Sequence, residues 1–444
     1  MRVRVDSDDN TASAVGGVEC HGGRAGNRRD WSLGLLFTAY ALSLFDRQII
    51  NVLAQDIKID LHLSDTELGL LAGSAFGIFY SVFGIPLGRL ADRIDRVKLI
   101  ASAVVMWSGF TVSCAMAGSF LQLFLTRVGV GVGEAGSQPA ATALIADLVP
   151  ERRRTSAMSF LMIGAPVGSF LGLMIGGFVG SRWGWRSAFV LAGLPGFALS
   201  VLIIATMRDP RSVATATQCQ SGSSLPGALR MIVGTPDFRR LVTMMTCSAF
   251  LVYASGAWLP PFFVRVHGMT TAQVGAYSAF AVGVGGAIGT LGGGLLCDRL
   301  HSDIANVEVK IILVSLGLCF PALVAVVLSP DRSLALLSYF LFNIFAFVWL
   351  GPTMTQIQKA VALDARSLAI ALSGASANII SLGLGVPIVG LISDALAPSS
   401  GRDSIAYALL ICAAFAVLIG TVAIWRLLLG SVADLDADAT AGKG

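Results

Sequence analysis

The sequence predicts an all-α membrane protein with twelve transmembrane helices arranged as two six-helix bundles. Hydrophobic residues make up 55% of the 444-residue chain and charged residues only 13%, a composition that no soluble domain of this length would tolerate. Long apolar runs alternate with short polar breaks, and each run reaches the roughly 20 residues that a helix needs to cross the hydrocarbon core. One long polar linker divides these runs into six and six.

The apolar runs set the order of the elements. Residues 1–30 are polar and contain no apolar core of the signal-peptide kind, so we expect a disordered cytosolic tail. The N-terminal bundle, residues 31–207, contains runs at 32–54, 65–88, 97–118, 121–149, 155–180 and 186–206. A cytoplasmic linker follows at 208–238. The C-terminal bundle, residues 239–430, contains runs at 240–263, 271–297, 309–329, 333–357, 367–393 and 405–429, and a cytosolic tail occupies 431–444.

Lysine and arginine are distributed unevenly between the two sides of such a helix array. If the N-terminus lies inside, most of these cations fall in cytoplasmic segments. The other side holds only Lys58, Arg182, Arg186, Arg265, Arg332 and Arg402. The positive-inside rule therefore predicts that both termini are cytoplasmic. We expect a multi-pass protein of a bacterial-type inner membrane.

Composition and motifs argue against several other classes of protein. The net charge of +4 is small and the cations are scattered, so nothing indicates a nucleic-acid partner. The seven cysteines form no CxxC pattern or Cys/His cluster, which argues against a zinc site or a disulfide framework. The sequence has no phosphate-binding loop and no nucleophile-base pair, so we expect neither an enzyme nor a bound cofactor.

Two of the apolar runs contain charges in mid-span. Arg127 and Glu134 lie seven residues apart in the fourth run, nearly two helical turns, so they share one face. Asp46 and Arg47 lie in the first run. An ionisable side chain at membrane depth costs at least about 2.5–3.5 kcal/mol and normally faces a polar cavity or a partner. The four side chains together can be formally neutral, as a shared buried site requires.

Proton coupling would have to use these carboxylates, because no histidine lies in mid-span. We predict that Glu134 is the proton carrier, since movement of Arg127 or Arg47 relative to it would change its affinity for a proton. The alternative is a static ion pair that fastens the first and fourth helices. Asp46 is expected to take part in the proton and substrate switch, with Arg47 as its partner or as a binder of an anionic headgroup. A purely structural pairing of Asp46 is the alternative, and Arg127 could take either role.

The two halves repeat a short pattern in the same place. The sequence GRLADR at 88–93 leaves the second run, and GGLLCDRL at 293–300 leaves the eighth. Internal repeats of this kind are typical of transporters. Duplication with a central loop predicts two bundles that rock about a site between them.

Several motifs resemble a known family. The run GRLADRIDRVK at 88–98 resembles the signature loop between helices two and three of the major facilitator superfamily. The sequences LFDRQ at 44–48, RVGVGVGEAG at 127–136 and ADLVPERR at 146–153 resemble its Spinster-like branch. The resemblance spans 31–430. It implies a carrier that works by alternating access and moves lysolipids or sphingoid lipids such as sphingosine-1-phosphate, with proton coupling in several members.

The signature loop implies a cytoplasmic gate. An acidic side chain there can cap a facing helix and hold one conformation shut, and Arg96 can reach Asp147 or Glu151. Asp95 departs from the glycine usual in this loop, but aspartate tolerates left-handed backbone, so the turn can survive. The alternative is a set of solvated turn charges that obey the positive-inside rule. The candidate gate residues are Asp92, Arg93, Arg96, Asp147, Glu151, Asp298 and Arg299.

The second half has almost no charge in mid-membrane. Its candidates for the substrate cavity are Asn343, Asn378 and the aromatic residue Phe347. A cavity charged on one side and apolar on the other suits a substrate with a headgroup and a tail. Glycines recur every four residues from Gly164 to Gly176 and predict close approach of another helix. The glycines between Arg127 and Glu134 could leave space around the charges or serve the same close packing.

The combined expectation is a monomeric, proton-linked secondary transporter of amphipathic lipids, such as a lysophospholipid or a sphingosine-1-phosphate-like lipid. Its driving force would be a proton gradient. Within the transporter class, the alternative is a proton-driven carrier of small organic anions or drugs, because buried arginines also suit a carboxylate or phosphate. Outside that class, the chain could be an uncoupled lipid facilitator or a transporter-shaped sensor. Flux that ignores a proton gradient would indicate the facilitator, and binding without flux the sensor.

Overall fold

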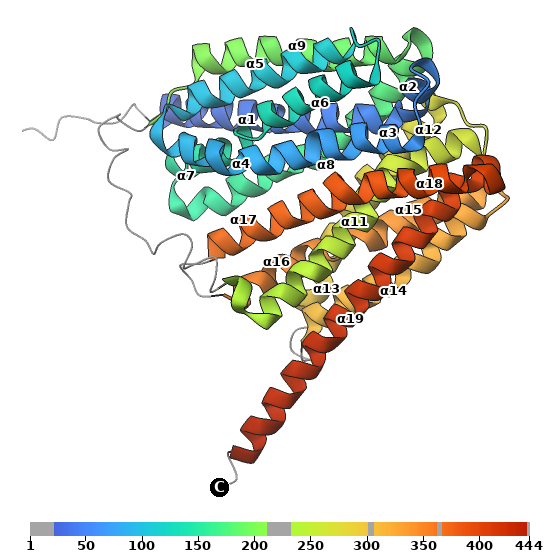
Figure 1. Cartoon of the computed structure of the whole chain (residues 1–444). Coiled ribbons are helices and arrows are strands. Elements are labelled where there is room, and N and C mark those ends of the chain that lie inside the picture. The colour runs from blue at the N-terminus through green and yellow to red at the C-terminus, as the bar shows by residue number, and fades with distance from the viewer. Residues whose placement is uncertain (1–21, 211–231, 301–305, 362–365, 442–444) are drawn as a thin grey trace, which may run out of the picture.

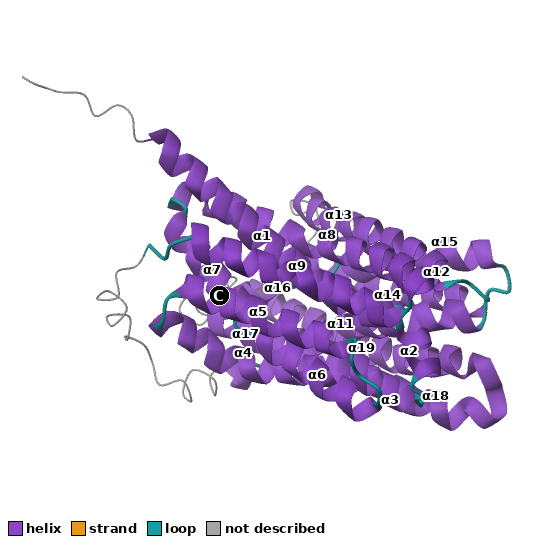
Figure 2. Cartoon of the chain, turned by 90° about the horizontal axis from the view of Figure 1, so that it is seen from above, coloured by secondary structure: helices purple, strands orange, loops and turns teal. Residues whose placement is uncertain are grey.

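Every regular element in the described part of the chain is a helix (Figures 1 and 2). The computed structural model describes residues 22–210, 232–300, 306–361 and 366–441. The N-terminal half contains α1 (Gly22–Val52), α2 (Ala54–Asp60), α3 (Asp65–Gly69), the π-helix η1 (Leu70–Ser74), α4 (Ala75–Arg93), α5 (Arg96–Cys114), α6 (Phe120–Glu134), α7 (Ser137–Leu148), α8 (Glu151–Trp183) and α9 (Trp185–Thr206).

The C-terminal half follows a similar order of elements, except that a π-helix interrupts the span that corresponds to the continuous α8. It contains α11 (Pro236–Arg265), α12 (Thr271–Ser278), the π-helix η2 (Ala279–Gly285), α13 (Gly286–Leu300), α14 (Val307–Leu328), α15 (Arg332–Phe347), α16 (Leu350–Lys359), α17 (Arg366–Ala377), the π-helix η4 (Asn378–Gly385), α18 (Val386–Ser400), the 3₁₀ turn η5 (Gly401–Asp403) and α19 (Ser404–Ala441).

The second and eighth transmembrane helices begin in the same way. Ser64 caps α3 and forms a capping box with Glu67, and Thr270 caps α12 and forms one with Gln273. Each capping box satisfies backbone N–H groups that a helix start leaves free. Both helices then pass through a π-helix, η1 or η2. The internal repeat therefore extends to cap chemistry and to irregular helical turns.

The fourth and tenth transmembrane helices are each broken, which corrects the expectation of continuous helices at 121–149 and 333–357. α6 ends at Glu134 and α15 ends at Phe347, and a short helix continues each span. Pro139 and Pro352 explain both breaks. A proline removes one backbone donor and its ring clashes with the carbonyl four residues earlier, which is the C-cap residue in both helices.

Ten stretches of the described residues are long and apolar enough to cross a membrane. The expected number was twelve, and two local features account for the difference. The fourth span is divided into α6 and α7, each too short to count alone. The stretch from Leu368 to Leu428 is continuous in composition, but it reverses direction at Gly401, whose φ of +56° suits a residue without a Cβ.

Glycine stripes set the closest helix contacts inside each half. A Cβ on Gly168 of α8 would lie 2.0 Å from the carbonyl oxygen of Ala41 in α1. A Cβ on Gly172 would lie 2.5 Å from the oxygen of Phe45, one turn along the same seam. In α13, a Cβ on Gly289 would lie 2.1 Å from the oxygen of Ile344 in α15. The predicted role of the α8 glycines in close packing is confirmed.

The hydrophobic cores of the two halves touch at the end where the halves meet. Most buried residues of the C-terminal half form one cluster, which also includes Ala54, Leu68 and Ala72. Most of those of the N-terminal half form two clusters, one of which includes Ala279 of the C-terminal half. We call the end that contains α2, α3 and the end of α18 the latch end, and the end that contains α7 and α16 the basic end. The halves approach one another at the latch end and diverge toward the basic end (Figure 1). The basic-end elements α7, α13, α16 and α17 pack chiefly within their own halves.

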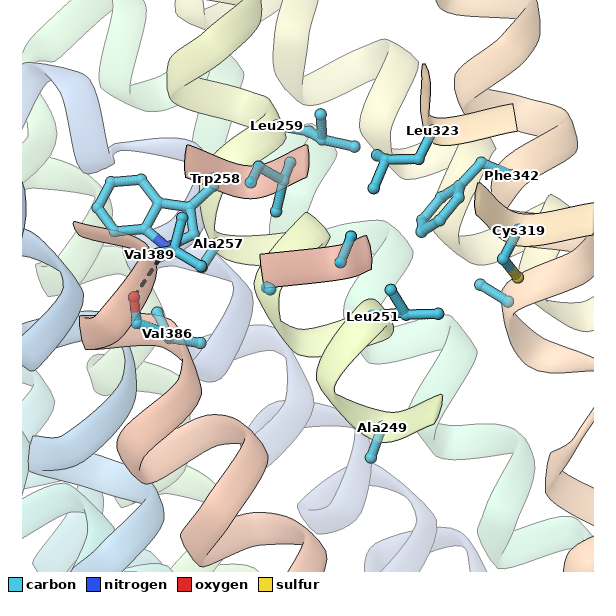
Figure 3. Packing of buried hydrophobic residues seen from close by; sticks show 14 of the residues in the cluster. Ala249, Leu251, Ala257, Trp258, Leu259, Cys319, Leu323, Phe342, Val386 and Val389 are labelled. Atoms are coloured by element: carbon cyan, nitrogen blue, oxygen red, sulfur yellow. Dashed lines mark hydrogen bonds between the residues drawn. The ribbon is translucent and has the colours of Figure 1, made fainter. Parts of the chain in front are cut away.

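Trp258 anchors α11 against α18 inside the C-terminal half (Figure 3). Its indole Nε1 donates a 3.0 Å hydrogen bond to the carbonyl oxygen of Val386, where the π-helix η4 passes into α18. Leu259 and Leu323 line the same cluster. A buried indole N–H usually has a partner of this kind, so the bond fixes α18 next to the latch end.

Candidate functional site

The carboxylate of Glu134 joins α1 to the broken fourth helix. Arg47 of α1 contacts Glu134 Oε2 through Nε at 2.8 Å and through Nη2 at 2.7 Å. Ser43, one turn before Arg47, donates to the same oxygen at 2.8 Å. Glu134 is buried, whereas about a quarter of the Arg47 side chain remains exposed. Two of the four predicted residues are therefore paired directly, and one face of the pair is accessible.

The break in the fourth transmembrane helix sets the electrostatic environment of Glu134. This residue is the last of α6, where unpaired backbone carbonyls make the environment negative. A carboxylate at that position is unfavourable unless a cation compensates for it. Arg47 supplies this compensation through its contacts with Glu134 Oε2.

Asp46 points away from this pair, toward α5 and α6. Its Oδ2 accepts a hydrogen bond from Thr111 of α5. Arg127 of α6 lies within electrostatic range of Asp46, although the described structure contains no direct ion pair between them. Adjacent residues on a helix point about 100° apart, which lets Asp46 and Arg47 serve two different neighbours.

Hydrogen-bonding capacity is left over at three of the four charged groups. In the described part of the chain, Asp46 Oδ1, Glu134 Oε1, and Nε and Nη1 of Arg127 are buried and have no hydrogen-bond partner. Buried polar atoms are normally paired, and exceptions mark sites of strain, catalysis or an absent ligand or water. The site therefore has donor and acceptor atoms that no described residue satisfies.

Aromatic side chains surround the two guanidinium groups. The Cζ atom of Arg47 lies 4.5 Å from the ring centre of Phe76 and 4.6 Å from that of Tyr80, both in α4. The Cζ atom of Arg127 lies 5.6 Å from the Phe76 ring. Such contacts stabilise a cation by about 0.5–2 kcal/mol while leaving its N–H groups free to bind an anion.

The glycines between Arg127 and Glu134 serve close packing. A Cβ on Gly131 would lie 2.9 Å from the Phe76 carbonyl oxygen, and one on Gly133 would lie 2.8 Å from the Trp107 backbone nitrogen. Neighbouring helices therefore fill the space beside these glycines. Of the two roles considered from the sequence, the structure favours close contact with α4 and α5.

The three predicted residues of the C-terminal half have different surroundings. Asn378, at the start of η4, accepts a 2.9 Å hydrogen bond from the hydroxyl of Tyr253 in α11, and that tyrosine lies within electrostatic range of Arg47. Asn343 donates to the carbonyl oxygen of Tyr339 in its own helix. Phe347 packs on Gly286 of α13. Among the described contacts, only Asn378 is connected to the charged site.

At the basic end, Arg96 forms an ion pair with Asp147 of α7, and its backbone N–H donates to Asp209 at 2.9 Å. Asp95 caps α5 with φ of −60°, so the expected left-handed turn is wrong: its side chain instead accepts from two N–H groups of the first helical turn. Arg93 and Glu151 are exposed and have no described partner. Asp92 lies in α4, but its side chain is outside the described part of the chain.

The C-terminal half has a different pairing at the corresponding position. Glu308 at the start of α14 pairs with Lys359 at the end of α16, at 2.7 Å. This matches the Arg96–Asp147 pair between the third and fourth helices with the signs reversed. Asp298 and Arg299 are exposed at the end of α13 and form no ion pair with another described residue. Glu308 was not predicted from the sequence, because it lies at a helix start, outside both the mid-span charges and the signature loop.

A second polar network, not predicted from the sequence, closes the latch end. Asp65 of α3 accepts hydrogen bonds from Arg265 of α11 at 2.7 and 2.9 Å, and it also pairs with Lys58. Ser393 of α18 donates to Asp65 at 2.7 Å. Asp394 caps the start of α3, accepting from the backbone N–H groups of Asp65 and Thr66. The network joins the two halves, and Asp65 is its buried centre.

The comparison with a family model decides the classification. The model of the Major Facilitator Superfamily matches residues 36–384, most of the chain. The chain belongs to the Major Facilitator Superfamily. Its family and fold are those of transporters rather than enzymes.

Individual members of the superfamily resemble the chain over nearly its whole length. An MFS-type efflux pump of Mycolicibacterium smegmatis is 32% identical over 408 residues, covering 91% of this chain and 94% of that protein. A hexuronate transporter of Bacillus subtilis is 26% identical, covering 71% and 77%. The crystal structure of a bacterial homologue of the human lysosomal transporter Spinster, inward-facing and unoccupied, has a TM-score of 0.79 at 26% identity, covering 92% and 98%. The Spinster-like resemblance found in the motifs is confirmed.

Ser43 was not predicted as part of the site, although its spacing from Arg47 in the sequence could have indicated it. Ser43 precedes Arg47 by four residues, so both lie on one face of α1 and reach the same carboxylate. Thr111 and Tyr253 gave no such signal, because single polar residues in apolar helices are common. Their importance follows only from the contacts with Asp46 and Asn378.

Proposed function

We propose that this member of the superfamily is a proton-linked secondary transporter of amphipathic anionic lipids of the lysophospholipid or sphingosine-1-phosphate kind, resident in a bacterial-type inner membrane. The observation that supports the proposal most is the Arg47–Glu134 pair, in which a buried carboxylate holds a partly exposed cation and has one oxygen without a hydrogen-bond partner among the described residues. Protonation of Glu134 would release Arg47, and an anionic headgroup could then take the place of the carboxylate. Proton and substrate would thus be linked through one guanidinium group.

Arg47 is better placed than Arg127 to contact the substrate. Arg127 is 1% exposed and sits beside Asp46, whereas the Arg47 side chain is 26% exposed. We assign Arg127 to balancing the charge of Asp46 and Arg47 to binding an anion. A planar guanidinium suits phosphate and carboxylate groups because it presents paired N–H donors.

The position of the inter-bundle contacts supports alternating access from the basic end. Asp65, Arg265 and Asp394 join the halves at the latch end, while the basic-end helices pack chiefly within their own halves. With the orientation expected from the positive-inside rule, this arrangement is an inward-facing state. Outward opening would require the latch network to break and the basic ends to come together.

A carrier of small organic anions is the second candidate. The relatives include a hexuronate transporter and an efflux pump, and a buried guanidinium binds a free carboxylate as readily as a lipid phosphate. Proteoliposome flux separates the two candidates. We expect a fluorescent lysophospholipid to move when a pH gradient is imposed and glucuronate not to move. Movement of glucuronate without lipid flux would overturn the lipid assignment, and lipid flux that ignores the gradient would indicate an uncoupled facilitator.

A further inference from the structure

The C-terminal half offers a neutral polar pair opposite the charged residues. The Tyr253 hydroxyl donates to Asn378 Oδ1 at 2.9 Å and bridges α11 to the first residue of η4. Tyr253 and Tyr40 both lie within electrostatic range of Arg47. The helix α11, which carries Tyr253, packs against α1, which carries Arg47, so Tyr253 connects Asn378 to the surroundings of the partly exposed guanidinium.

The helix faces that hold this pair are open. A Cβ added to Gly256, one turn after Tyr253, would meet no atom within 4 Å, and the same is true of Gly374, one turn before Asn378. One turn after Asn378, the side chain of Leu382 lies 3.0 Å from the position that a Cβ on Gly77 of α4 would occupy. Leu382 also packs against hydrophobic clusters of both halves. Leu382 thus joins the two halves about one turn from Asn378, on the latch side.

Two features indicate that the pair has spare capacity for a ligand. Asn378 uses only Oδ1 in the described hydrogen bonds, so its Nδ2 donors are free among the described residues. It also begins a π-helix, and π-helical turns occur frequently at functional sites. A neutral donor and acceptor pair near a cation suits a substrate that bears a hydroxyl close to its anionic group.

We propose that Tyr253 and Asn378 determine specificity by binding a hydroxyl group next to the anionic group that Arg47 holds. This proposal rests on the proposed function and refines its substrate class to hydroxyl-bearing anions. The same chemistry occurs in a lysolipid, whose glycerol hydroxyl lies beside the phosphate, and in a sugar acid. One neutral hydrogen bond contributes about 0.5–1.5 kcal/mol, so its loss should lower affinity about two- to tenfold.

The test compares probes with and without the hydroxyl, using the full-length protein in nanodiscs. The lipid arm uses oleoyl lysophosphatidic acid and the analogue that lacks the glycerol 2-hydroxyl. The small-molecule arm uses glucuronate and cyclohexanecarboxylate. We expect the wild type to bind the hydroxyl-bearing member of at least one pair about two- to tenfold more tightly. The probe pair that shows the difference tells whether the anion is a lipid phosphate or a small carboxylate.

The variants Tyr253→Phe and Asn378→Ala should lose this discrimination while still binding the deoxy probe as well as the wild type does. Tyr277→Phe is the matched control, since that tyrosine is exposed on α12 and should discriminate as the wild type does. Equal binding of both members by the wild type, or discrimination retained in Asn378→Ala, would overturn the specificity proposal and leave the transport function standing. Failure of the wild type to bind any of the four anions would overturn both.

Discussion

Both Arg47 nitrogens that reach Glu134 contact the same carboxylate oxygen, and the other oxygen has no partner in the described part of the chain. A pair of this kind holds its cation without saturating the carboxylate. The ion pair can therefore separate when Glu134 binds a proton or when Arg47 binds an anion. The proposed link between proton and substrate depends on this separation.

Replacing Arg47 by lysine should weaken anion binding about tenfold, because lysine keeps the charge but cannot present two nitrogens or stack between Phe76 and Tyr80. The measurement is the dissociation constant for oleoyl lysophosphatidic acid in nanodiscs. Arg182→Lys is the matched control, since that exposed arginine stacks on Phe178 far from the site. Wild-type affinity in Arg47→Lys would remove Arg47 from the binding site.

Replacing Asp65 by asparagine should open the latch end. Arg265 and Lys58 would lose the carboxylate that holds them together. Breaking a buried ion pair costs about 3–5 kcal/mol, which would shift the balance between the two states by more than about 100-fold. Distances between spin labels placed at Ile59 and Ser399, on opposite halves, report the opening.

Asp60→Asn is the control for the latch experiment. Asp60 pairs with Arg186 at the same end, but both residues belong to the N-terminal half. Its loss should leave the label distances unchanged. If Asp65→Asn also left them unchanged, the network would be a consequence of closure and would not hold the halves together.

The carboxyl group of Asp56, at the latch end, should make the stability of the protein depend on pH. Burial raises the pKa of its carboxyl, and the 2.9 Å hydrogen bond from Thr271 of the other half opposes the rise. A raised pKa in the folded state means that the protonated form stabilises the protein. This stabilisation is complete below the unfolded pKa of about 3.9 and is lost as the pH rises through the folded-state value.

The variant Asp56→Asn keeps an oxygen acceptor for Thr271 and carries no charge. It should therefore unfold at a higher temperature than the wild type at pH 7, with a difference that shrinks as the pH falls toward 4. Thermal unfolding in detergent across that range checks the prediction. A difference that grew on acidification would contradict the assigned sign.

The glycine seam between α8 and α1 predicts a large loss of stability from one methyl group. Gly168→Ala would place a Cβ 2.0 Å from the Ala41 carbonyl oxygen, so the helices would have to separate, at a cost of about 1–3 kcal/mol. Gly317→Ala in α14 is the control, because no atom lies within 4 Å of that position. The control should unfold at or slightly above the wild-type temperature, since alanine favours helix.

The fold could be predicted well from the sequence because bilayer thickness dictates the length of each apolar run. The helix breaks were harder to predict from the sequence. Pro139 and Pro352 coincide with breaks, but prolines such as Pro166 lie inside a continuous helix. Arg47 and Glu134 were predicted because charges are rare and costly at membrane depth. Asp65 and Arg265 were not predicted because they lie 200 residues apart in the sequence. Both are at the ends of their helices, where charged residues are common and do not by themselves indicate a site.

The decisive measurement is gradient-driven flux of a fluorescent lysophospholipid into proteoliposomes that contain the Glu134→Gln variant. Glutamine preserves size and an acceptor oxygen but cannot exchange a proton, so the account predicts that flux driven by a pH gradient is lost while lipid binding remains at least as tight. Glu67→Gln is the control, because glutamine can replace glutamate in the capping box of α3. Full gradient-driven flux in Glu134→Gln would contradict the account, since proton coupling would then lie elsewhere.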